Sequence, residues 1–352
     1  MGSKRIRKNP VRPTRISDIA ELAGVSNATV SRVINGFSTV NEDIAQRVRD
    51  IIKEVGYVPS QTARSLSLGA SQTIGVVVPD LSNPMYHEVL RGVHRAAAAD
   101  GYRVLVADTL EDPQGEAAVA LDIRHRTDAL VLIAPRMTRP ELLALLMRVH
   151  PAAVINRTTG ENAVVARVDY AAGIQTLADH LRDLGHSRIA FLSGPEQSRS
   201  NQDRQRGLED YRAAHPEIEI LEIPTGSGFD DGHRSWDAVR DSGVSAVMAF
   251  NDLVALGLIG RLTEEGIRVP DDLSVAGFDN IPFARYSSPS LTTMAVDLGE
   301  VGASAWRDLR QEIEGVERRE ASVFAPVLQA RASTGPCPVH VEEPAEERGT
   351  SM

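Results

Sequence analysis

Residues 15–36, which read RISDIAELAGVSNATVSRVING, constrain the fold of this chain more than any other stretch. In the first half, apolar residues recur at the spacing of one helical face: Ile16, Ile19, Ala20 and Ala23. Gly24 ends this helix, and Ser26 is placed to cap the next one. The buried stripe of the second helix consists of Val30, Val33 and Ile34. The pattern predicts a helix-turn-helix.

The open side of the second helix carries small and polar residues: Ser26, Asn27, Ala28, Thr29, Ser31 and Arg32. A helix-turn-helix places the N-terminal residues of its second helix against base edges in the major groove. Asn pairs with adenine, Arg pairs with guanine, and the methyl group of Ala contacts thymine. We therefore expect these six residues to bind double-stranded DNA. A helical hairpin that only packs against a neighbour is the alternative for the same apolar pattern.

Charge is distributed unevenly along the chain. The first 69 residues carry 11 Lys and Arg against 6 Asp and Glu, whereas the rest of the chain carries 27 against 42. A basic N-terminal module on an acidic protein is suited to approach phosphates while the bulk stays soluble. Residues 1–14 lack apolar periodicity and contain two prolines, so we expect a basic disordered arm rather than a specific groove contact.

Three segments, SDIAELAGVSNATVSRVING, VGYVPSQTARSL and IGVVVPDLSNPMY, closely resemble the lactose-repressor (LacI/GalR) family of bacterial transcription regulators. The order and spacing of the segments agree with that family, and the similarity continues to about Ser333. The resemblance implies a homodimer whose headpieces bind a two-fold operator. It also implies a core related to periplasmic sugar-binding proteins.

A third helix is predicted from Glu42 to Val55, followed by Gly56, which completes a headpiece of residues 15–58. Residues 59–70 form a weak helix or linker that is too short to stand alone. The resemblance implies that this segment folds as a hinge helix only on DNA, where Leu66 enters the minor groove. An apolar wedge of this kind unstacks a base step and bends the duplex. A linker with an incidental leucine is the alternative.

Residues 71–333 alternate continuous apolar runs with amphipathic helices such as 171–185 and 253–266. Continuous runs are typical of parallel strands buried on both faces, and we expect them at residues 74–78, 104–107, 129–133, 189–192, 246–250 and 274–277. The predicted fold is therefore an all-α helix-turn-helix headpiece followed by an α/β, periplasmic-binding-protein-like core of two parallel-sheet lobes.

Open parallel sheets bind ligands beyond the carboxyl ends of their strands. The candidates at those ends and in nearby loops are Asp80, Met85, Tyr86, Arg204, Phe229, Asn251 and Asp279. Carboxylate and amide groups bind sugar hydroxyls, arginine fixes a ring or anionic oxygen, and an aromatic face covers the apolar side of a sugar. We predict a small polar effector, a sugar or sugar derivative, bound between the lobes.

The resemblance implies effector contacts for Arg204, Asn251 and Asp279, an aromatic contact for Phe229, and a departure at Met85, where Phe is common. Structural alternatives exist for single residues: Asn251 or Asp252 as a helix cap, Arg204 as a surface ion pair, and Asp279 as a turn residue. Arg157 and Asp169 lie at the lobe boundary, where they either join the pocket or bridge the lobes.

Enzymatic chemistry finds little support in the sequence. The sole cysteine, Cys337, falls in a segment (334–352) that we expect to be an acidic disordered tail, and the nine histidines show no paired-ligand spacing. His186 precedes a predicted strand and is expected to pack or cap. We expect no catalysis, no cofactor and no metal. We also expect a cytoplasmic location, because the N-terminus is charged and no apolar run has membrane-spanning length.

The sequence thus predicts a transcriptional regulator, a repressor that binds a pseudo-palindromic operator as a homodimer. The tail lacks leucine heptads, so it gives no basis for a tetramer. We expect a ligand that closes the lobes to change whether the two Leu66 hinges pair on DNA, with either induction or corepression as the outcome. Activation of some promoters remains open. A non-regulatory carbohydrate-binding protein whose N-terminal helices contact another protein is the alternative from another functional class.

Overall fold

The computed structural model describes residues 15–34, 39–57, 70–160, 163–316 and 320–338. The chain forms two compact units, residues 1–72 and residues 73–352. Leu66 and most of the segment 59–70 lie outside the described residues, as do the arm 1–14 and residues 339–352.

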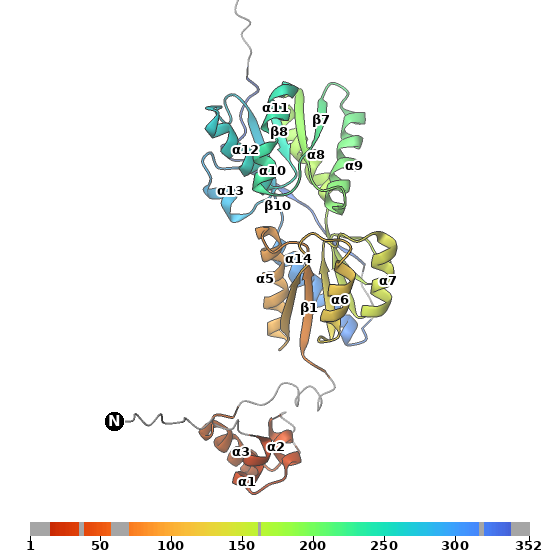
Figure 1. The fold of residues 1–352 in the computed structure, drawn as a ribbon, viewed down its shortest axis with the longest axis vertical. Helices are drawn as coiled ribbons and strands as arrows, with labels where there is room; N and C mark the ends of the chain where they lie inside the picture. Colours follow the sequence, from red (N-terminus) through yellow and green to blue (C-terminus); the bar gives the residue numbers. More distant parts are fainter. Residues whose placement is uncertain (1–14, 35–38, 58–69, 161–162, 317–319, 339–352) are drawn as a thin grey trace, which may run out of the picture. The chain divides into compact units, whose positions relative to one another are not determined.

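Three short helices make up the described part of the first unit, as the sequence predicts (Figure 1): α1 (Ile16–Ala23), α2 (Asn27–Ile34) and α3 (Glu42–Glu54). At the start of α1, Arg15 N donates to the carboxylate of Asp18 at 2.7 Å. Gly24 ends α1 with a φ of 67°, a left-handed conformation that glycine adopts without strain. Ser26 caps α2, because its Oγ accepts a hydrogen bond from Thr29 N at 3.1 Å.

The three helices share one small hydrophobic core. Its centre consists of three side chains with no exposed surface: Ile19, Val30 and Val48. Partly buried residues from all three helices surround them, among them Tyr57 just after α3. The predicted apolar stripes therefore meet one another, which leaves the opposite side of α2 for recognition.

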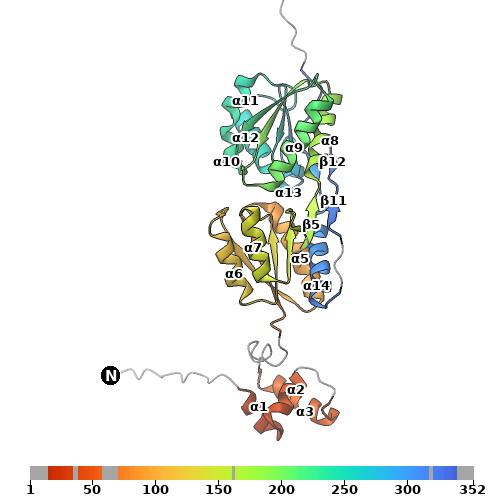
Figure 2. The ribbon, with the colours of Figure 1, turned by 90° about the vertical axis from the view of Figure 1, so that its right-hand side faces the viewer.

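The second unit contains two lobes, each built on a six-stranded sheet (Figures 1 and 2). The sheet of lobe 1 has the order β11-β5-β4-β3-β1-β2 and is parallel throughout. Its strands are β1 (Thr73–Val78), β2 (Arg103–Asp108), β3 (Ala129–Ile133), β4 (Ala152–Ile155), β5 (Val164–Val168) and β11 (Ser322–Phe324).

The sheet of lobe 2 has the order β12-β10-β9-β8-β6-β7, and only its edge strand β12 is antiparallel to its neighbour. Its strands are β6 (Arg188–Ser193), β7 (Glu219–Pro224), β8 (Ala246–Ala249), β9 (Ser274–Asp279), β10 (Thr292–Ala295) and β12 (Val327–Gln329). The expected strands are confirmed, and six further strands complete the two sheets.

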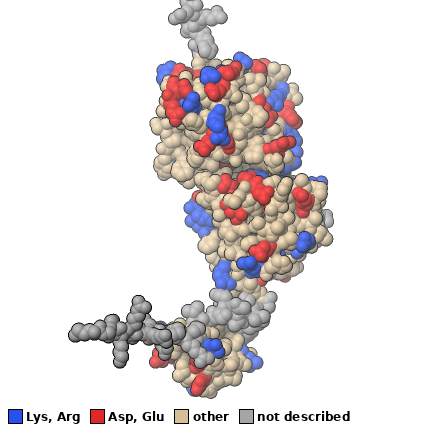
Figure 3. Space-filling model, in the orientation of Figure 1, with Lys and Arg blue, Asp and Glu red and all other residues tan. Residues whose placement is uncertain are grey.

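Helices cover both faces of each sheet (Figure 2). Those of lobe 1 are α5 (Pro84–Ala99), α6 (Glu116–Arg124), α7 (Arg139–Val149) and α14 (Leu298–Ile313). Those of lobe 2 are α8 (Tyr170–Asp183), α9 (Arg199–Ala214), α10 (Phe229–Arg234), α11 (Trp236–Ser242), α12 (Asp252–Glu264) and α13 (Pro282–Tyr286). Acidic and basic side chains are interspersed on the face of the core shown in Figure 3.

The lobes are not consecutive segments of the chain. After lobe 2 is nearly complete, the chain returns to lobe 1 to form α14 and β11, and then crosses back to add β12 to lobe 2. The α14 helix packs against α5, and one hydrophobic cluster includes side chains of both lobes. The sequence pattern does not predict these crossings, because each returning element looks like an ordinary helix or strand.

The predicted disordered tail from residue 334 is wrong for residues 334–338, which pack on lobe 2. The ring of His186 is buried and hydrogen-bonds to Gly335 O at 3.0 Å and to Ser245 Oγ at 2.9 Å. Cys337 N donates to Leu184 O at 2.9 Å. These backbone partners lie far away in sequence, so composition alone misses them.

Two helices approach closely at Gly92 of α5 and Gly302 of α14. A Cβ at Gly92 would lie 1.9 Å from Gly299 O, and one at Gly302 would lie 2.1 Å from Val89 O. Because these are contacts with backbone atoms, a side chain at either position fits only if one helix shifts away from the other. By contrast, a Cβ at Gly260 on α12 would meet nothing within 4 Å.

We predict that Gly92→Ala destabilises the core unit by about 1–3 kcal/mol, the usual range for overpacking. The matched variant Gly260→Ala removes a helical glycine at an open position and is expected to be neutral or to stabilise by about 0.5–1 kcal/mol. Urea unfolding of both variants followed by circular dichroism checks the difference. Equal stability of the two variants would contradict the close α5–α14 approach.

Candidate functional site

The recognition side of α2 is available in the first unit. Asn27, Ala28 and Arg32 are exposed, and Thr29 and Ser31 are half-buried. Ser26 is exposed and also caps the helix. The structure therefore places the six predicted DNA-contacting residues on α2 and its N-terminal cap, with Asn27 and Ala28 in the first turn and Arg32 in the last turn.

A small cavity of about 10 Å³ lies between the two lobes of the second unit. Five of the predicted effector residues line it: Met85, Tyr86, Arg204, Asn251 and Asp279. All five are buried. The volume is near the lower limit for a single water molecule, because the protein's own polar side chains fill the space.

Arg204 on α9 is 1% exposed, which excludes the surface ion pair considered as its alternative. Its guanidinium lies over three aromatic rings: Tyr170 at 4.3 Å, Phe250 at 4.8 Å and Phe278 at 4.1 Å from the ring centres. Its Nη1 donates to Ser200 O at 3.0 Å, whereas its buried Nε has no hydrogen-bond partner among the described residues. A buried guanidinium with an unused donor is suited to an acceptor atom of a ligand.

Asp279 ends β9 and has a φ of 103°, in a region that few non-glycine residues adopt. Burial raises the pKa of its carboxyl to about 7, although the Arg204 guanidinium, whose Nη2 lies 4.0 Å from Oδ1, acts in the opposite direction. Backbone strain and a perturbed carboxyl at a strand end are features of functional sites.

Asn251 caps α12, as its structural alternative proposes. Its Oδ1 accepts a hydrogen bond from Val254 N at 2.9 Å, and its Nδ2 donates to Ser227 O at 2.9 Å. These bonds use one of the two amide protons and fix the plane of the side chain beside the cavity. Capping and ligand contact are therefore compatible at this position. The neighbouring Asp252 is buried, and its carboxylate accepts hydrogen bonds from Ile281 N and Thr293 Oγ1 of lobe 2.

Arg136 and Glu111 belong to the site and were missed from the sequence. Arg136 follows β3 and is buried, and its guanidinium donates to Glu111 at 2.5 and 2.9 Å and to Tyr86 Oη at 2.9 Å. Burial raises the pKa of Tyr86 to about 12, so the hydroxyl stays protonated. The signal for Arg136 was its place directly beyond a buried strand, the same criterion that selected Asp80.

Asp80 and Phe229 are not among the residues that line the cavity. The carboxylate of Asp80 accepts hydrogen bonds from Ser82 N and Ser82 Oγ, both at 2.7 Å, which forms a local turn. Phe229 is 46% exposed at the first position of α10. Aromatic faces at the cavity instead come from Tyr86, Tyr170 and Phe250, so the structure leaves Asp80 and Phe229 out of the candidate site.

The two residues at the lobe boundary have different roles. Asp169 caps α8 by accepting a hydrogen bond from Ala172 N at 3.1 Å. Arg157 lines a second cavity of about 410 Å³, which also lies between the lobes and shares Arg136 with the first. Arg157 therefore lines a cavity next to the inner one, and its hydrogen bonds to Pro135 O and Met137 O stay within lobe 1.

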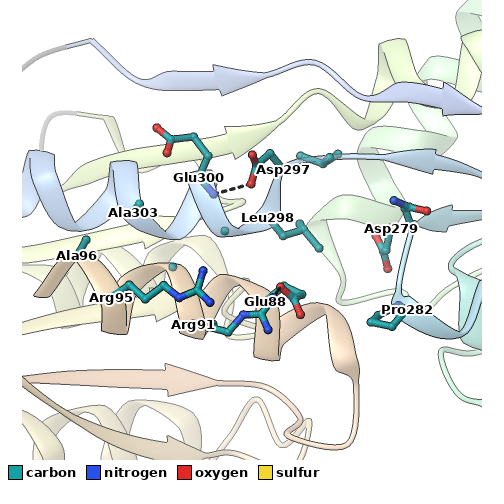
Figure 4. Close-up of a pocket in the computed structure, with 14 residues that line it drawn as sticks. Glu88, Arg91, Arg95, Ala96, Asp279, Pro282, Asp297, Leu298, Glu300 and Ala303 are labelled. Carbon is teal, nitrogen blue, oxygen red and sulfur yellow. Dashed lines mark hydrogen bonds and ion pairs between the residues drawn. The ribbon is translucent and has the colours of Figure 1, made fainter. Parts of the chain in front are cut away.

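A third cavity, of about 560 Å³, lies beside α5 and α14, close to the loop after β9 (Figure 4). Glu88 and Arg91 pair on α5, and Glu300 pairs with Arg307 on α14. Asp297 accepts a hydrogen bond from Glu300 N at 2.9 Å and caps α14. Most charged groups of this cavity therefore already have partners on their own helices, although Arg95 and Asp279 also line it, and we assign no effector to it.

In the part of the chain that the structure describes, no helix has the length and apolar character to cross a membrane. Within the same residues, His, Cys, Asp and Glu side chains form no group of three or more able to hold a metal ion. The absence of a cofactor stays a prediction.

Two segments match known protein families. Residues 15–60 match the bacterial regulatory proteins, lacI family, and residues 178–334 match a periplasmic binding protein-like domain. The chain is 30% identical over 332 residues to the HTH-type transcriptional regulator DegA of Bacillus subtilis (strain 168), which covers 92% of this chain and 98% of that protein. It is 32% identical over 306 residues to the ribose operon repressor of Halalkalibacterium halodurans, with 86% and 91% covered.

The chain belongs to the lacI family of bacterial regulatory proteins. Solved structures of the lacI family agree. A lac repressor dimer bound to operator and the anti-inducer ONPF matches with a TM-score of 0.84 and 26% identity over 92% of this chain and all of that one. The transcriptional regulator CelR in complex with cellobiose matches with a TM-score of 0.67 and 26% identity over the same shares.

These comparisons confirm the predicted fold class and family. This lacI-family protein is a DNA-binding transcriptional regulator. The relatives named above are regulators of transcription rather than enzymes.

We predict that Asp279→Asn makes the core less sensitive to alkaline pH. A folded-state pKa of about 7, above the ordinary 3.8, means that the folded protein holds this proton more tightly than the unfolded chain. Stability from this group is therefore present below about pH 4 and is lost as the pH rises through 7, by roughly 4 kcal/mol in total.

Unfolding free energies at pH 5 and pH 8 check this expectation. The unfolding free energy of the variant should increase relative to that of the wild type when the pH is raised from 5 to 8. Asp210→Asn, an exposed position on α9, is the control and should shift both measurements equally. An unchanged difference between the Asp279→Asn variant and the wild type at the two pH values would rule out the raised pKa.

Proposed function

We propose that this protein represses transcription by binding a pseudo-palindromic operator as a homodimer, and that a small ligand between the lobes of its core controls the affinity for DNA. The observation that carries the proposal is the combination, in one chain, of an exposed recognition face on α2 and a two-lobed core with buried polar groups converging between the lobes. Related proteins supply the context: a lac repressor dimer is bound to operator, and CelR is bound to cellobiose.

The chemistry of the cleft favours a sugar or sugar derivative. Arg204 Nε has an unused proton, Asn251 Nδ2 has a second one, and the carboxyl of Asp279 both donates and accepts near neutral pH. Hydroxyl groups, which donate and accept at the same atom, match such a set. The rings of Tyr86, Tyr170 and Phe250 provide an apolar side for the same ligand.

Ligand binding requires the lobes or their side chains to rearrange. Pockets for small molecules commonly have volumes of about 300–1,000 Å³, far above the 10 Å³ between the lobes here. A ligand that binds one arrangement of the lobes more tightly shifts the population toward it. In a homodimer, that shift changes how the two headpieces meet the operator, which gives the coupling between ligand and DNA.

The protein, by this proposal, acts by binding and not by catalysis, and it works on DNA in the cytoplasm. A carbohydrate-binding protein without a regulatory role would not need base-reading side chains on α2. Loss of sequence-specific DNA binding on substitution of those side chains therefore separates the two functions.

The first test is selection of bound sequences from a random duplex library by the purified full-length protein. We expect a two-fold symmetric site. Arg32→Ala should then weaken binding to that site about 5–150-fold and relax the preference at one base pair in each half, as loss of a base contact of about 1–3 kcal/mol requires.

Arg126→Ala serves as the control, because Arg126 is exposed and pairs with Asp122 on lobe 1, outside the first unit. It should bind the selected site like the wild type. Recovery of no motif with the wild type, with and without a panel of sugars, would refute the repressor. A motif that Arg32→Ala binds unchanged would refute the role of α2.

A further inference from the structure

The second cavity between the lobes, which we call the outer cavity, is lined by arginines of both lobes. It has a volume of about 410 Å³, within the range of small-molecule sites. Lobe 1 contributes Arg136, Arg139 and Arg157, and lobe 2 contributes Arg199. Glu196 is the one carboxylate among the described residues that line it.

Arg157 is one of two members of this set whose charges lack a carboxylate partner among the described residues, and it is the more buried of the two. It lies in the loop after β4 and is half-buried. Its Nη1 donates to Pro135 O at 2.7 Å and to Met137 O at 3.0 Å, and no ion pair joins it to a described residue. Two carbonyls hold the guanidinium in place, while Nε and Nη2 stay available to an acceptor in the cavity.

The electrostatic surroundings of Arg157 disfavour its charge. Burial lowers the pKa of its guanidinium, and the neighbouring charges of Arg199 and Arg136 lower it further, with Glu116 acting in the opposite direction. Glu116 is itself committed to the backbone, since its Oε2 accepts hydrogen bonds from Arg136 N and Met137 N. A guanidinium held close to like charges gains most from an anion placed among them.

The other arginines are oriented by carboxylates. Arg136 is bound by Glu111, and Arg199 pairs with Asp203 at 2.9 Å. Arg139 is exposed, and its place at the rim adds a further cation. These pairs fix the arginine planes and leave Arg157 and Arg139 as the charges without a described carboxylate partner.

Two helices also start at this cavity. Arg139 is the first residue of α7 and Arg199 is the first residue of α9, and the two helices lie on the same side of the core (Figures 1 and 2). The positive ends of both helix dipoles add to the field of the guanidinium groups.

We propose that the effector of this regulator is a sugar derivative that carries an anionic group, a phosphate monoester or a carboxylate, and that Arg157, assisted by Arg139 and Arg199, binds this group in the outer cavity. The inference rests on the proposed function. Arg136 lines both cavities, so a ligand that also contacts the inner groups around Arg204 requires this side chain or the lobes to rearrange. Arginine matches either anionic group with paired N–H donors.

The arrangement also explains how the ligand moves the lobes. Arg157 and Arg139 belong to lobe 1, whereas Arg199 and the carboxylate of Glu196 belong to lobe 2. An anion bound to arginines of both lobes is attracted to both sides of the cleft and favours lobe closure. A neutral sugar lacks this effect on the outer cavity.

Isothermal titration calorimetry of the full-length protein tests the proposal with matched sets: neutral pentoses and hexoses, their phosphate monoesters, and their aldonic and uronic acids. Inorganic phosphate and sulfate are included as anion probes. We expect at least one anionic sugar to bind at least tenfold more tightly than its neutral parent, and to change the affinity for the selected operator. The phosphate and carboxylate arms identify which anion the site takes.

Arg157→Gln should weaken binding of that anionic sugar about 10–100-fold, as expected for lost hydrogen bonds to a charged group, and leave the neutral parent within twofold. Arg139→Gln, at an exposed position, should weaken binding of the anionic sugar less. This second variant keeps the proposal testable if Arg157→Gln does not fold. Arg126→Gln is the matched control, because it removes an exposed arginine of lobe 1 just before β3, at the end of the strands opposite the cleft. Melting temperatures confirm that each variant is folded.

The proposal is overturned if neutral parents bind as tightly as their anionic derivatives, if no anionic sugar binds at millimolar concentration, or if neither Arg157→Gln nor Arg139→Gln reduces the preference for the anion. If a neutral sugar alone alters operator affinity, the proposed repressor function is supported and the proposed anion site is refuted. An anionic sugar that binds through Arg157 and leaves operator affinity unchanged would instead refute ligand control.

Discussion

The burial of Arg204 between the lobes is the constraint on which the centre of the core depends. A guanidinium taken out of water needs partners, and the chain supplies aromatic rings, one backbone carbonyl and a carboxyl 4.0 Å away rather than a complete set of hydrogen bonds. The pKa of Asp279, near 7, follows from the same burial. An incomplete set of partners at a buried site is expected where the missing partner is a ligand.

Parallel sheet topology explains why these groups meet. Both sheets present the carboxyl ends of their strands to the cleft, so the loops after β3 and β4 and the last residue of β9 place Arg136, Arg157 and Asp279 at the cleft although more than a hundred residues separate the first from the last. The crossings into α14 and β11 then link the two sheets. A movement of one lobe against the other must therefore be accommodated by these connections.

Local patterns predicted most of the elements and five of the seven effector candidates at the inner cavity. Helix periods fixed α1, α2 and α3, and strand ends selected Asp279 and Asn251. Three-dimensional pairing explains the rest: Glu111 matters through its bond to Arg136, and Tyr170 through its ring beneath Arg204. Phe229 fails as a lining residue because α10 begins there and leaves the ring exposed, a helix boundary that a Gly-rich stretch does not reveal.

The central claim is that the charged groups between the lobes serve a ligand and not the fold. The most direct measurement is the melting temperature of Arg204→Met at pH 5.5, where the carboxyl of Asp279 is protonated and is not left as an unpaired charge. We predict a melting temperature equal to or above that of the wild type, because an apolar side chain of similar length replaces an incompletely bonded cation. A fall of more than about 5 °C would show that Arg204 is a structural residue and would contradict the account.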